Sequence, residues 1–280
     1  MDYLQPKEFA AKMVDAGEEK IFMSTRDTLI RGFGAGALLT LAAFMALNII
    51  ALTKSLLVGA ILFPVGFIML NMMKFDLVTG CFALCPLPVL AKREGASWGL
   101  VLRNWTLIFT SNFAGALFVA FICAFSVRFG FLGEAETFAK GPLNGKDLSA
   151  LLTKVGEART NGFEAKGMHG WWTCFVRGIL CNWMVSMGVV GSIYAQSTIG
   201  KFFCMWAPIF VFFFLIFEHA VVNMFLFPFA MLMGADITIP TYFIYNEIPT
   251  TIGNVIGGFF LVGLPLFITH FKTAKPINAQ

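Results

Sequence analysis

Apolar residues gather into six long stretches, separated by short segments that carry most of the charge. The stretches cover residues 29–53, 56–90, 99–127, 171–195, 202–233 and 249–271. About 20 residues of helix cross a membrane hydrocarbon core about 30 Å thick, so each stretch is predicted to be a membrane segment. The second and fifth are too long for one simple span. Charge interrupts each near its middle and proline follows, which predicts two broken helices.

The composition supports a membrane protein of the all-α class. Hydrophobic residues make up 58% of the 280 and charged residues 13%, with a mean hydropathy of +0.78. A soluble domain is usually about a quarter charged. The net charge of +4 is small and spread over a few loops, which argues against nucleic acid as a partner. All six cysteines fall inside apolar stretches and are predicted to be packing thiols, and we expect no cofactor and no metal.

The distribution of lysine and arginine predicts the orientation in a cell (plasma or inner) membrane. With residues 1–28 as a cytoplasmic amphipathic helix, the short segments on that side hold nine basic residues, and the short outer loops hold Lys54 alone. The segment 128–170 also carries basic residues, but it is long, contains acids, and is predicted to be an extracytoplasmic linker. Residues 272–280 then form a cytoplasmic tail, so both termini are expected inside.

The chain repeats itself. When it is shifted by 142 positions (218 minus 76), "FDLVTGCFALCP" at 75–86 lies on "FEHAVVNMFLFP" at 217–228. In the same register Asn112 meets Asn254, and near the head of each half a shift of 146 aligns 29–36 with 175–182. The repeats are 29–127 and 171–271, with three segments each. An odd number of spans predicts an inverted repeat, in which the site lies near the midplane where corresponding helices are broken.

The two breaks meet at a pair of acids, Asp76 and Glu218. Helix ends inside a membrane leave N–H and C=O groups that lipid cannot satisfy. An acidic side chain at each new helix start can cap such N–H groups and suits the positive end of the dipole. We therefore expect mainly a structural role for both acids.

His219 has Leu77 as its counterpart, so the repeat does not require an ionisable group there. Ionisable groups inside a membrane normally face a cavity or a pathway. The alternative is a neutral histidine that hydrogen-bonds the backbone between helices. We favour a functional role.

The segments "FEHAVVNMF", "DLVTG", "GILCNW" and "TIGNVIGG" resemble the formate/nitrite transporter family, and the resemblance covers nearly the whole chain. It implies an aquaporin-like six-helix protomer that assembles as a homopentamer, with one pore in each protomer. It also implies transport of a small monovalent anion, formate or nitrite first, with bicarbonate, hydrosulfide and lactate as alternatives.

The resemblance also implies roles for particular residues. His219 is the central histidine, Thr79 faces it, and Asn182 and Asn223 match polar positions of the pore. Phe63 and Phe212 match one apolar constriction, and Phe67 and Val78 match the other. Lys166 matches a lysine near the outer mouth that gathers anions.

The sequence departs from the family pattern before the first acid, where Lys74 and Phe75 stand in place of small residues. Val78 also replaces an aromatic residue, which predicts a wider constriction. Lys74 is expected to pair with an acid such as Asp76 or to reach the membrane surface, and the alternative is a fixed positive charge in the pore.

These residues suit passage of a weak acid. A bare anion loses much of its hydration energy in an apolar passage. An imidazole between two apolar rings can hydrogen-bond the anion or give it a proton, so that formate or nitrite crosses at least partly as the neutral acid. Protons and membrane lipid are therefore expected partners.

Other classes of membrane protein fit less well. Neither break carries the Asn-Pro-Ala signature of a neutral-solute channel, and an ammonium channel usually has paired pore histidines. A haem b enzyme needs histidine pairs on facing spans, and His219 is the one histidine well inside. No nucleophile–base arrangement is evident, so no enzyme is expected. A non-transporting sensor or assembly subunit is the remaining alternative.

Overall fold

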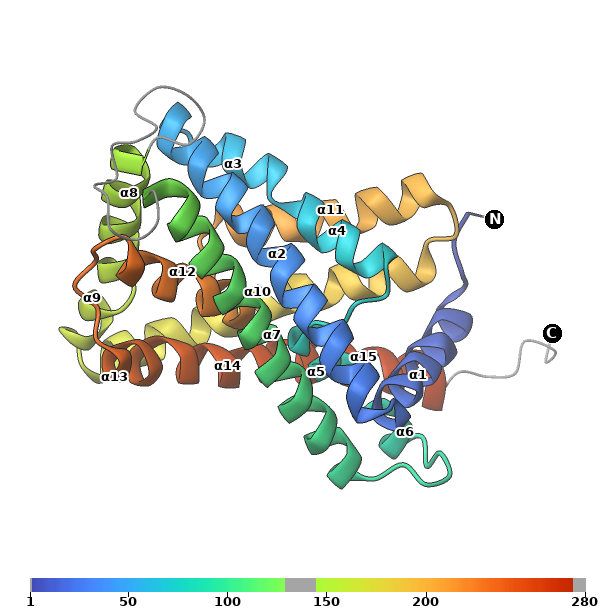
Figure 1. Cartoon of the computed structure of the whole chain (residues 1–280). Coiled ribbons are helices and arrows are strands. Elements are labelled where there is room, and N and C mark those ends of the chain that lie inside the picture. Colours follow the sequence, from blue (N-terminus) through green and yellow to red (C-terminus); the bar gives the residue numbers. More distant parts are fainter. Residues whose placement is uncertain (1, 129–144, 274–280) are drawn as a thin grey trace.

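The computed structural model describes residues 2–128 and 145–273, and within them the regular structure is helical (Figure 1). One isolated antiparallel bridge, between Tyr3 and Ala195, is the exception in this part of the chain. The prediction of an all-α membrane protein agrees with this structure.

Within residues 2–128 and 145–273, four helices are long and apolar enough to cross a membrane. The first three are α2 (Thr25–Thr53), α7 (Trp98–Arg128) and α10 (Met168–Tyr194). The fourth is a continuous rod over Ile239–Lys272, made of α13 (Ile239–Tyr242), η1 (Phe243–Glu247), α14 (Ile248–Val255), η2 (Ile256–Gly263), α15 (Leu264–Leu266) and η3 (Phe267–Lys272).

The second and fifth apolar stretches each form shorter helices separated by a non-helical turn. The second contains α3 (Leu56–Leu62), α4 (Pro64–Met72), α5 (Val78–Leu84) and α6 (Leu87–Leu90). The fifth contains α11 (Thr198–Phe214) and α12 (Ala220–Leu232).

The two turns have the same backbone geometry. Lys74 and Ile216, which are 142 positions apart, both adopt the left-handed conformation, with φ of 55° and 54°. Just beyond them, Phe75 N donates to Leu70 O at 2.9 Å and Phe217 N donates to Phe212 O at 3.0 Å. A left-handed residue followed by such a bond is a common way to end a helix. A β-branched isoleucine rarely adopts this conformation, so the surrounding structure must hold it.

Helices pack in corresponding pairs, α2 along α7 and α10 along α14 (Figure 1). Glycines allow the close approach. A Cβ on Gly115 would lie 2.2 Å from Phe33 O, and one on Gly257, in η2 directly after α14, would lie 2.2 Å from Ile179 O. Small residues at such crossings let membrane helices come into contact through their backbones.

Three further helices lie at the two opposite ends of the molecule (Figure 1). At one end α1 (Pro6–Phe22) packs against η3, where the rings of Phe9 and His270 lie 5.7 Å apart. At the other end lie α8 (Gly145–Ala158) and α9 (Asn161–Glu164). The first and last described helical segments therefore share one end of the molecule.

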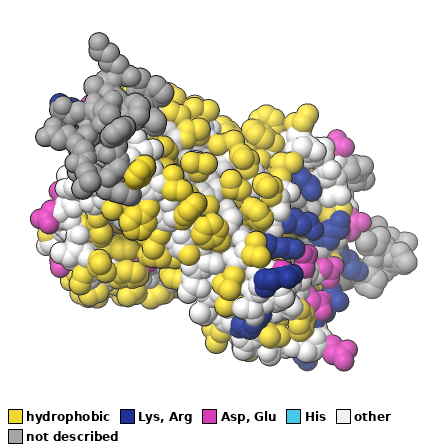
Figure 2. Space-filling view, in the orientation of Figure 1, with side chains coloured by type: hydrophobic (Ala, Val, Ile, Leu, Met, Phe, Trp, Pro, Cys, Tyr) yellow, Lys and Arg dark blue, Asp and Glu magenta, His cyan; other side chains and the backbone are white. Residues whose placement is uncertain are grey.

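The surface between these ends is apolar. Figure 2 shows hydrophobic side chains over the middle of the visible face, with most of its basic and acidic side chains at the end where α1 lies. Large exposed apolar residues include Leu41, Met69, Phe118, Phe203 and Phe260. An exposed apolar surface of this extent is typical of a protein surrounded by lipid or by other subunits.

Candidate functional site

The turn between α4 and α5 holds Asp76, which is 3% exposed and forms an ion pair with Lys20 of α1. Burial alone would lower the pKa of Lys20, but the neighbouring carboxylate of Asp76 raises it above its usual value. Asn104 of α7 fixes the backbone here, because its Nδ2 donates to Lys20 O at 2.9 Å. Because its pKa is raised, Lys20 remains charged at neutral pH beside the first break.

The turn between α11 and α12 holds Glu218, which is fully buried. Arg159, at the junction of α8 and α9, binds it with two bonds, from Nε to Oε1 at 2.9 Å and from Nη2 to Oε2 at 2.6 Å. Asn223 and Asn246 also donate to Oε2, at 2.9 and 3.1 Å. Burial would lower the pKa of Arg159, but Glu218 raises it. A bidentate pair of this kind is among the strongest polar contacts in proteins.

Asparagine side chains from neighbouring helices accept hydrogen bonds from free N–H groups at the starts of α5 and α12. Val78 N donates to Asn112 Oδ1 at 2.9 Å, and Ala220 N donates to Asn254 Oδ1 at 3.0 Å. The Nδ2 group of each asparagine also donates a 3.0 Å hydrogen bond to a backbone carbonyl in the same turn, that of Asp76 for Asn112 and that of Glu218 for Asn254. We expected the acids to cap these helices; instead asparagines accept these bonds while the acids bind a cation.

His219 lies at the start of α12 and is 1% exposed. Its Nδ1 accepts a hydrogen bond from Val222 N at 3.2 Å, and its Nε2 lies 3.3 Å from Thr79 Oγ1. Because an accepting Nδ1 carries no hydrogen, the neutral ring has its proton on Nε2, directed toward Thr79. The ring also stacks on Phe212, with centroids 5.5 Å apart. His219 is thus both a helix cap and a donor aimed at the first break.

The two asparagines matched to the pore are fully buried and bonded. Asn182 Nδ2 donates to Thr79 O at 3.0 Å and to Asn254 O at 2.6 Å. Asn223 belongs to the network around Glu218 and accepts a bond from Arg159 Nη2 at 3.0 Å. Asn182 therefore binds backbone carbonyls of α5 and α14, and Asn223 binds the charged pair at the second break.

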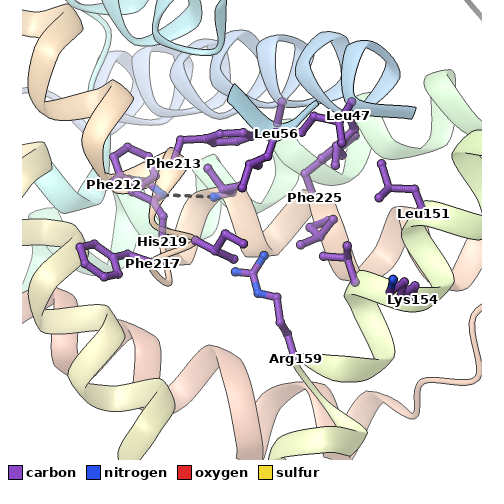
Figure 3. Close-up of a pocket in the computed structure, with 16 residues that line it drawn as sticks. Leu47, Leu56, Leu151, Lys154, Arg159, Phe212, Phe213, Phe217, His219 and Phe225 are labelled. Carbon is purple, nitrogen blue, oxygen red and sulfur yellow. Dashed lines mark hydrogen bonds between the residues drawn. The ribbon is translucent and has the colours of Figure 1, made fainter. Parts of the chain in front are cut away.

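Three cavities are lined in part by residues of the two turns. The first, the α8-end cavity, has a volume of about 280 Å³ and reaches His219. Figure 3 shows Arg159 pointing into it, with Phe212 and Phe213 on one side and Leu151 on the other.

The other two cavities are both lined by Phe75 and Asp76 of the first break. A small cavity of about 30 Å³ is lined by Phe67, Gly80 and Asp76. The α1-end cavity of about 590 Å³ is lined by Lys20 and Lys74 among others.

Phenylalanine rings cluster behind the wall of the α8-end cavity that Phe212 and Phe213 form. Phe63 meets Phe212 edge to face, with centroids 5.7 Å apart, and stacks on Phe213 at 4.2 Å. Both Phe63 and Phe212 are buried, as are Phe67 and Val78. The structure thus brings Phe63 and Phe212 together beside His219, and it places Phe67 in the wall of the small cavity.

Two lysines singled out in the sequence are exposed. Lys166 follows α9, and the cation that reaches Glu218 from this end is Arg159. Lys74 lines the α1-end cavity, and the ion-pair partner of Asp76 is Lys20. Sequence reasoning missed Arg159 and Lys20, because each lies among other charges in a polar segment outside the repeats.

The sequence matches a known family of membrane proteins over nearly its whole length. The model of the formate/nitrite transporter family matches residues 7–268. The chain belongs to the formate/nitrite transporter family.

Relatives with known names support this membership. The uncharacterized transporter YrhG of Bacillus subtilis is 32% identical over 97% of this chain and 96% of its own length. A probable formate transporter of Methanothermobacter thermautotrophicus is 35% identical over 78% of this chain and 76% of its own. The formate channel FocA of Escherichia coli is 28% identical, covering 97% and 96%.

Solved structures share the fold. An FNT family ion channel superposes with a TM-score of 0.75 at 21% identity, covering 94% of this chain and 97% of that one. A pentameric formate channel with formate bound superposes with a TM-score of 0.68, also at 21% identity, covering 87% and 96%. As a member of this family, the chain is a multi-pass membrane channel or transporter for anions and not an enzyme.

Proposed function

We propose that the chain conducts small monovalent weak-acid anions, with formate or nitrite first, past His219. The proposal is supported by the buried His219–Thr79 pair. His219 lines the α8-end cavity together with Phe212, and Gly80, next to Thr79, lines the small cavity. A single polar donor pair in such a passage suits an ion that must shed water and be held briefly.

The charged groups near the two breaks favour an anion over a cation. Lys20 and Arg159 are both held beside the pathway, and each is paired with an acid. Pairing makes their charge a fixed feature of the pathway without leaving a bare cation that would trap the anion. Lys74 and Lys166 then serve as exposed charges that attract anions to the two mouths.

His219 acts first as a hydrogen-bond donor through Nε2. Donation of a proton requires the doubly protonated ring, and protonation of Nδ1 breaks its bond from Val222 N. An anion at Nε2 offsets that loss, since it attracts the second charge. The proton step is therefore tied to the presence of the anion, and the substrate crosses the Phe63–Phe212 constriction at least partly as the neutral acid.

The architecture of the proposal is an aquaporin-like protomer with six spans in a 3+3 inverted repeat. The equivalent turns at Lys74 and Ile216 and the equivalent bonds of Asn112 and Asn254 support it. The repeats are 29–127 and 171–271, and the segments 1–28, 128–170 and 272–280 complete the chain. The boundary at 128–170 lies partly outside the described residues.

Assembly and orientation are also part of the proposal. The homopentamer is supported by the pentameric formate channel among the structural neighbours. Both termini on the cytoplasmic side are supported by α1 and η3 sharing one end of the molecule. The α1-end cavity then opens to the cytoplasm.

The direct test is uptake into liposomes that contain the purified protein. Formate, nitrite and bicarbonate are compared with chloride, and protein-free liposomes give the background leak. We expect saturable flux of formate or nitrite well above that of chloride. Equal flux of chloride, or no flux above background for any anion, would contradict the proposal, and the second result would favour a sensor or assembly role.

A further inference from the structure

The α8-end cavity has more room than a formate or nitrite ion needs. Its volume is about 280 Å³, whereas one water occupies roughly 30 Å³ in the liquid. Its walls are mainly hydrocarbon, from α2, α3, α8, α11 and α12. A three-atom anion would leave most of this apolar surface against water, which is unfavourable.

Positive charge is confined to one side of this cavity. Arg159 lines it and uses Nε and Nη2 to bind Glu218 and Asn223. Its Nη1 makes no hydrogen bond to the residues that the structure describes. Lys154, five residues earlier on α8, also lines the cavity, and within the described ranges it has no ion pair. Figure 3 shows both side chains at the α8 wall, with Leu47 and Leu56 across from them.

The exit from this cavity toward the first break is far narrower than the cavity. Phe212 and Phe213 pack against Phe63, and the small cavity beside Asp76 has a volume of only about 30 Å³. A molecule that fits among Leu47, Leu56 and the other apolar walls therefore does not follow a small anion through the rings.

We propose that the α8-end cavity binds monocarboxylates with a short apolar tail, such as butyrate, and that these ligands block the entry of the small anion. The carboxylate binds at Arg159 Nη1 and Lys154, and the tail lies against the apolar wall. This inference rests on the proposed function for what is blocked, but the binding itself is independent of transport.

The test measures uptake of labelled formate into liposomes with the competitor at equal concentration on both sides. That arrangement removes any competitor gradient and any effect of protein orientation. The inhibition constant is expected to fall about fourfold for each methylene from acetate to butyrate. Butyramide, which has the same shape without the charge, is expected not to inhibit.

Matched lysines on α8 separate charge recognition from general effects. Lys154→Gln is expected to raise the inhibition constant of butyrate about two- to fivefold. Lys146→Gln removes the same charge from the same helix outside the cavity, and it is expected to leave that constant unchanged. Equal effects of the two substitutions would contradict the assigned site.

Binding is measured separately by saturation-transfer NMR on the detergent-solubilised protein. If formate is transported while butyrate neither binds nor inhibits, the inference is wrong and the proposed function stands. If butyrate binds in a Lys154-dependent way but formate is not transported, the site stands and the proposed function is wrong. An inhibition constant that does not change from acetate to butyrate would also overturn the inference.

Discussion

At the scale of single residues, the two acids at the breaks are stabilised by cations from outside the repeats. Lys20 comes from α1 and Arg159 from the α8–α9 junction. Loss of one partner of a buried pair leaves an uncompensated charge, which is far more costly than loss of an exposed pair. Both cations are therefore predicted to matter for folding as well as for the pathway.

Arg159→Met is expected to destabilise the protein by about 3 kcal/mol, because Glu218 is left buried without its cation. Arg159→Lys keeps the charge but loses the bidentate geometry, so it should recover part of the loss. Thermal unfolding in detergent measures both. The double variant Arg159→Met, Glu218→Gln should be more stable than the single one; if it is less stable, the ion-pair account is wrong.

The stabilisation from Lys20 is expected to be independent of pH between about 6 and 9. Its pKa in the folded protein is raised above that of the unfolded chain, which is about 10.4. A raised pKa gives stability that is complete below the unfolded pKa and is lost as the pH rises through the folded pKa. The difference in unfolding temperature between wild type and Lys20→Met should therefore be constant over this range. A difference that shrinks from pH 6 to pH 9 would contradict the assignment.

At the scale of helices, much of the break geometry was accessible from sequence because the chain carries it twice. The shift of 142 aligned Asp76 with Glu218 and Asn112 with Asn254, and the structure gives each pair equivalent bonds. The function of the asparagines was not accessible, since periodicity does not show which carbonyl or N–H a buried amide meets. The cations were missed because they lie outside the repeat.

Asn112→Leu and Asn254→Leu are expected to destabilise the protein by similar amounts, about 2–3 kcal/mol each. Each replacement leaves a buried N–H and carbonyl groups without partners. Asn48→Leu is the control, because among the described residues the Asn48 side chain bonds only to Phe44 O on its own helix. Thermal unfolding measures the stability of the three variants. An equally large fall in unfolding temperature for Asn48→Leu would show that the bonds between helices stabilise no more than a bond within one helix.

Gly115→Ala is expected to destabilise the contact between α2 and α7, since the new Cβ would lie 2.2 Å from Phe33 O. Gly99→Ala on the same helix is the control, because its nearest neighbour, Ser97 Oγ, is 3.8 Å away. The unfolding temperature should fall for the first and change little for the second. Equal unfolding temperatures for the two variants would show that the close contact between α2 and α7 at Gly115 does not contribute to stability.

At the scale of the whole molecule, hydropathy alone predicted an all-α membrane protein, and the structure and the family comparison agree. The resemblance to formate/nitrite transporters is confirmed by the family model over residues 7–268. Composition does not reveal stoichiometry, because lipid-facing and subunit-facing surfaces are both apolar. The roles given to Thr79, Asn182 and Lys166 remain predictions, because a match to a family pattern locates a residue but does not show that an anion passes it.

The proposed assembly predicts a particle of five chains, each of 30.8 kDa, in mild detergent. Light scattering coupled to size exclusion, corrected for bound detergent, measures the protein mass directly. A stable monomer that still transports formate would show that the pentamer is not needed for the pathway.

In the proposed mechanism, His219 hydrogen-bonds the anion and ties proton transfer to its passage. The decisive measurement is formate uptake with internal pH recorded in the same liposomes, for wild type, His219→Asn and His219→Phe. Asparagine can still cap a helix and donate a hydrogen bond, but it cannot carry a proton. We expect formate uptake with internal acidification for wild type, uptake without acidification for His219→Asn, and little uptake for His219→Phe. Uptake and acidification by His219→Phe equal to wild type would contradict the account.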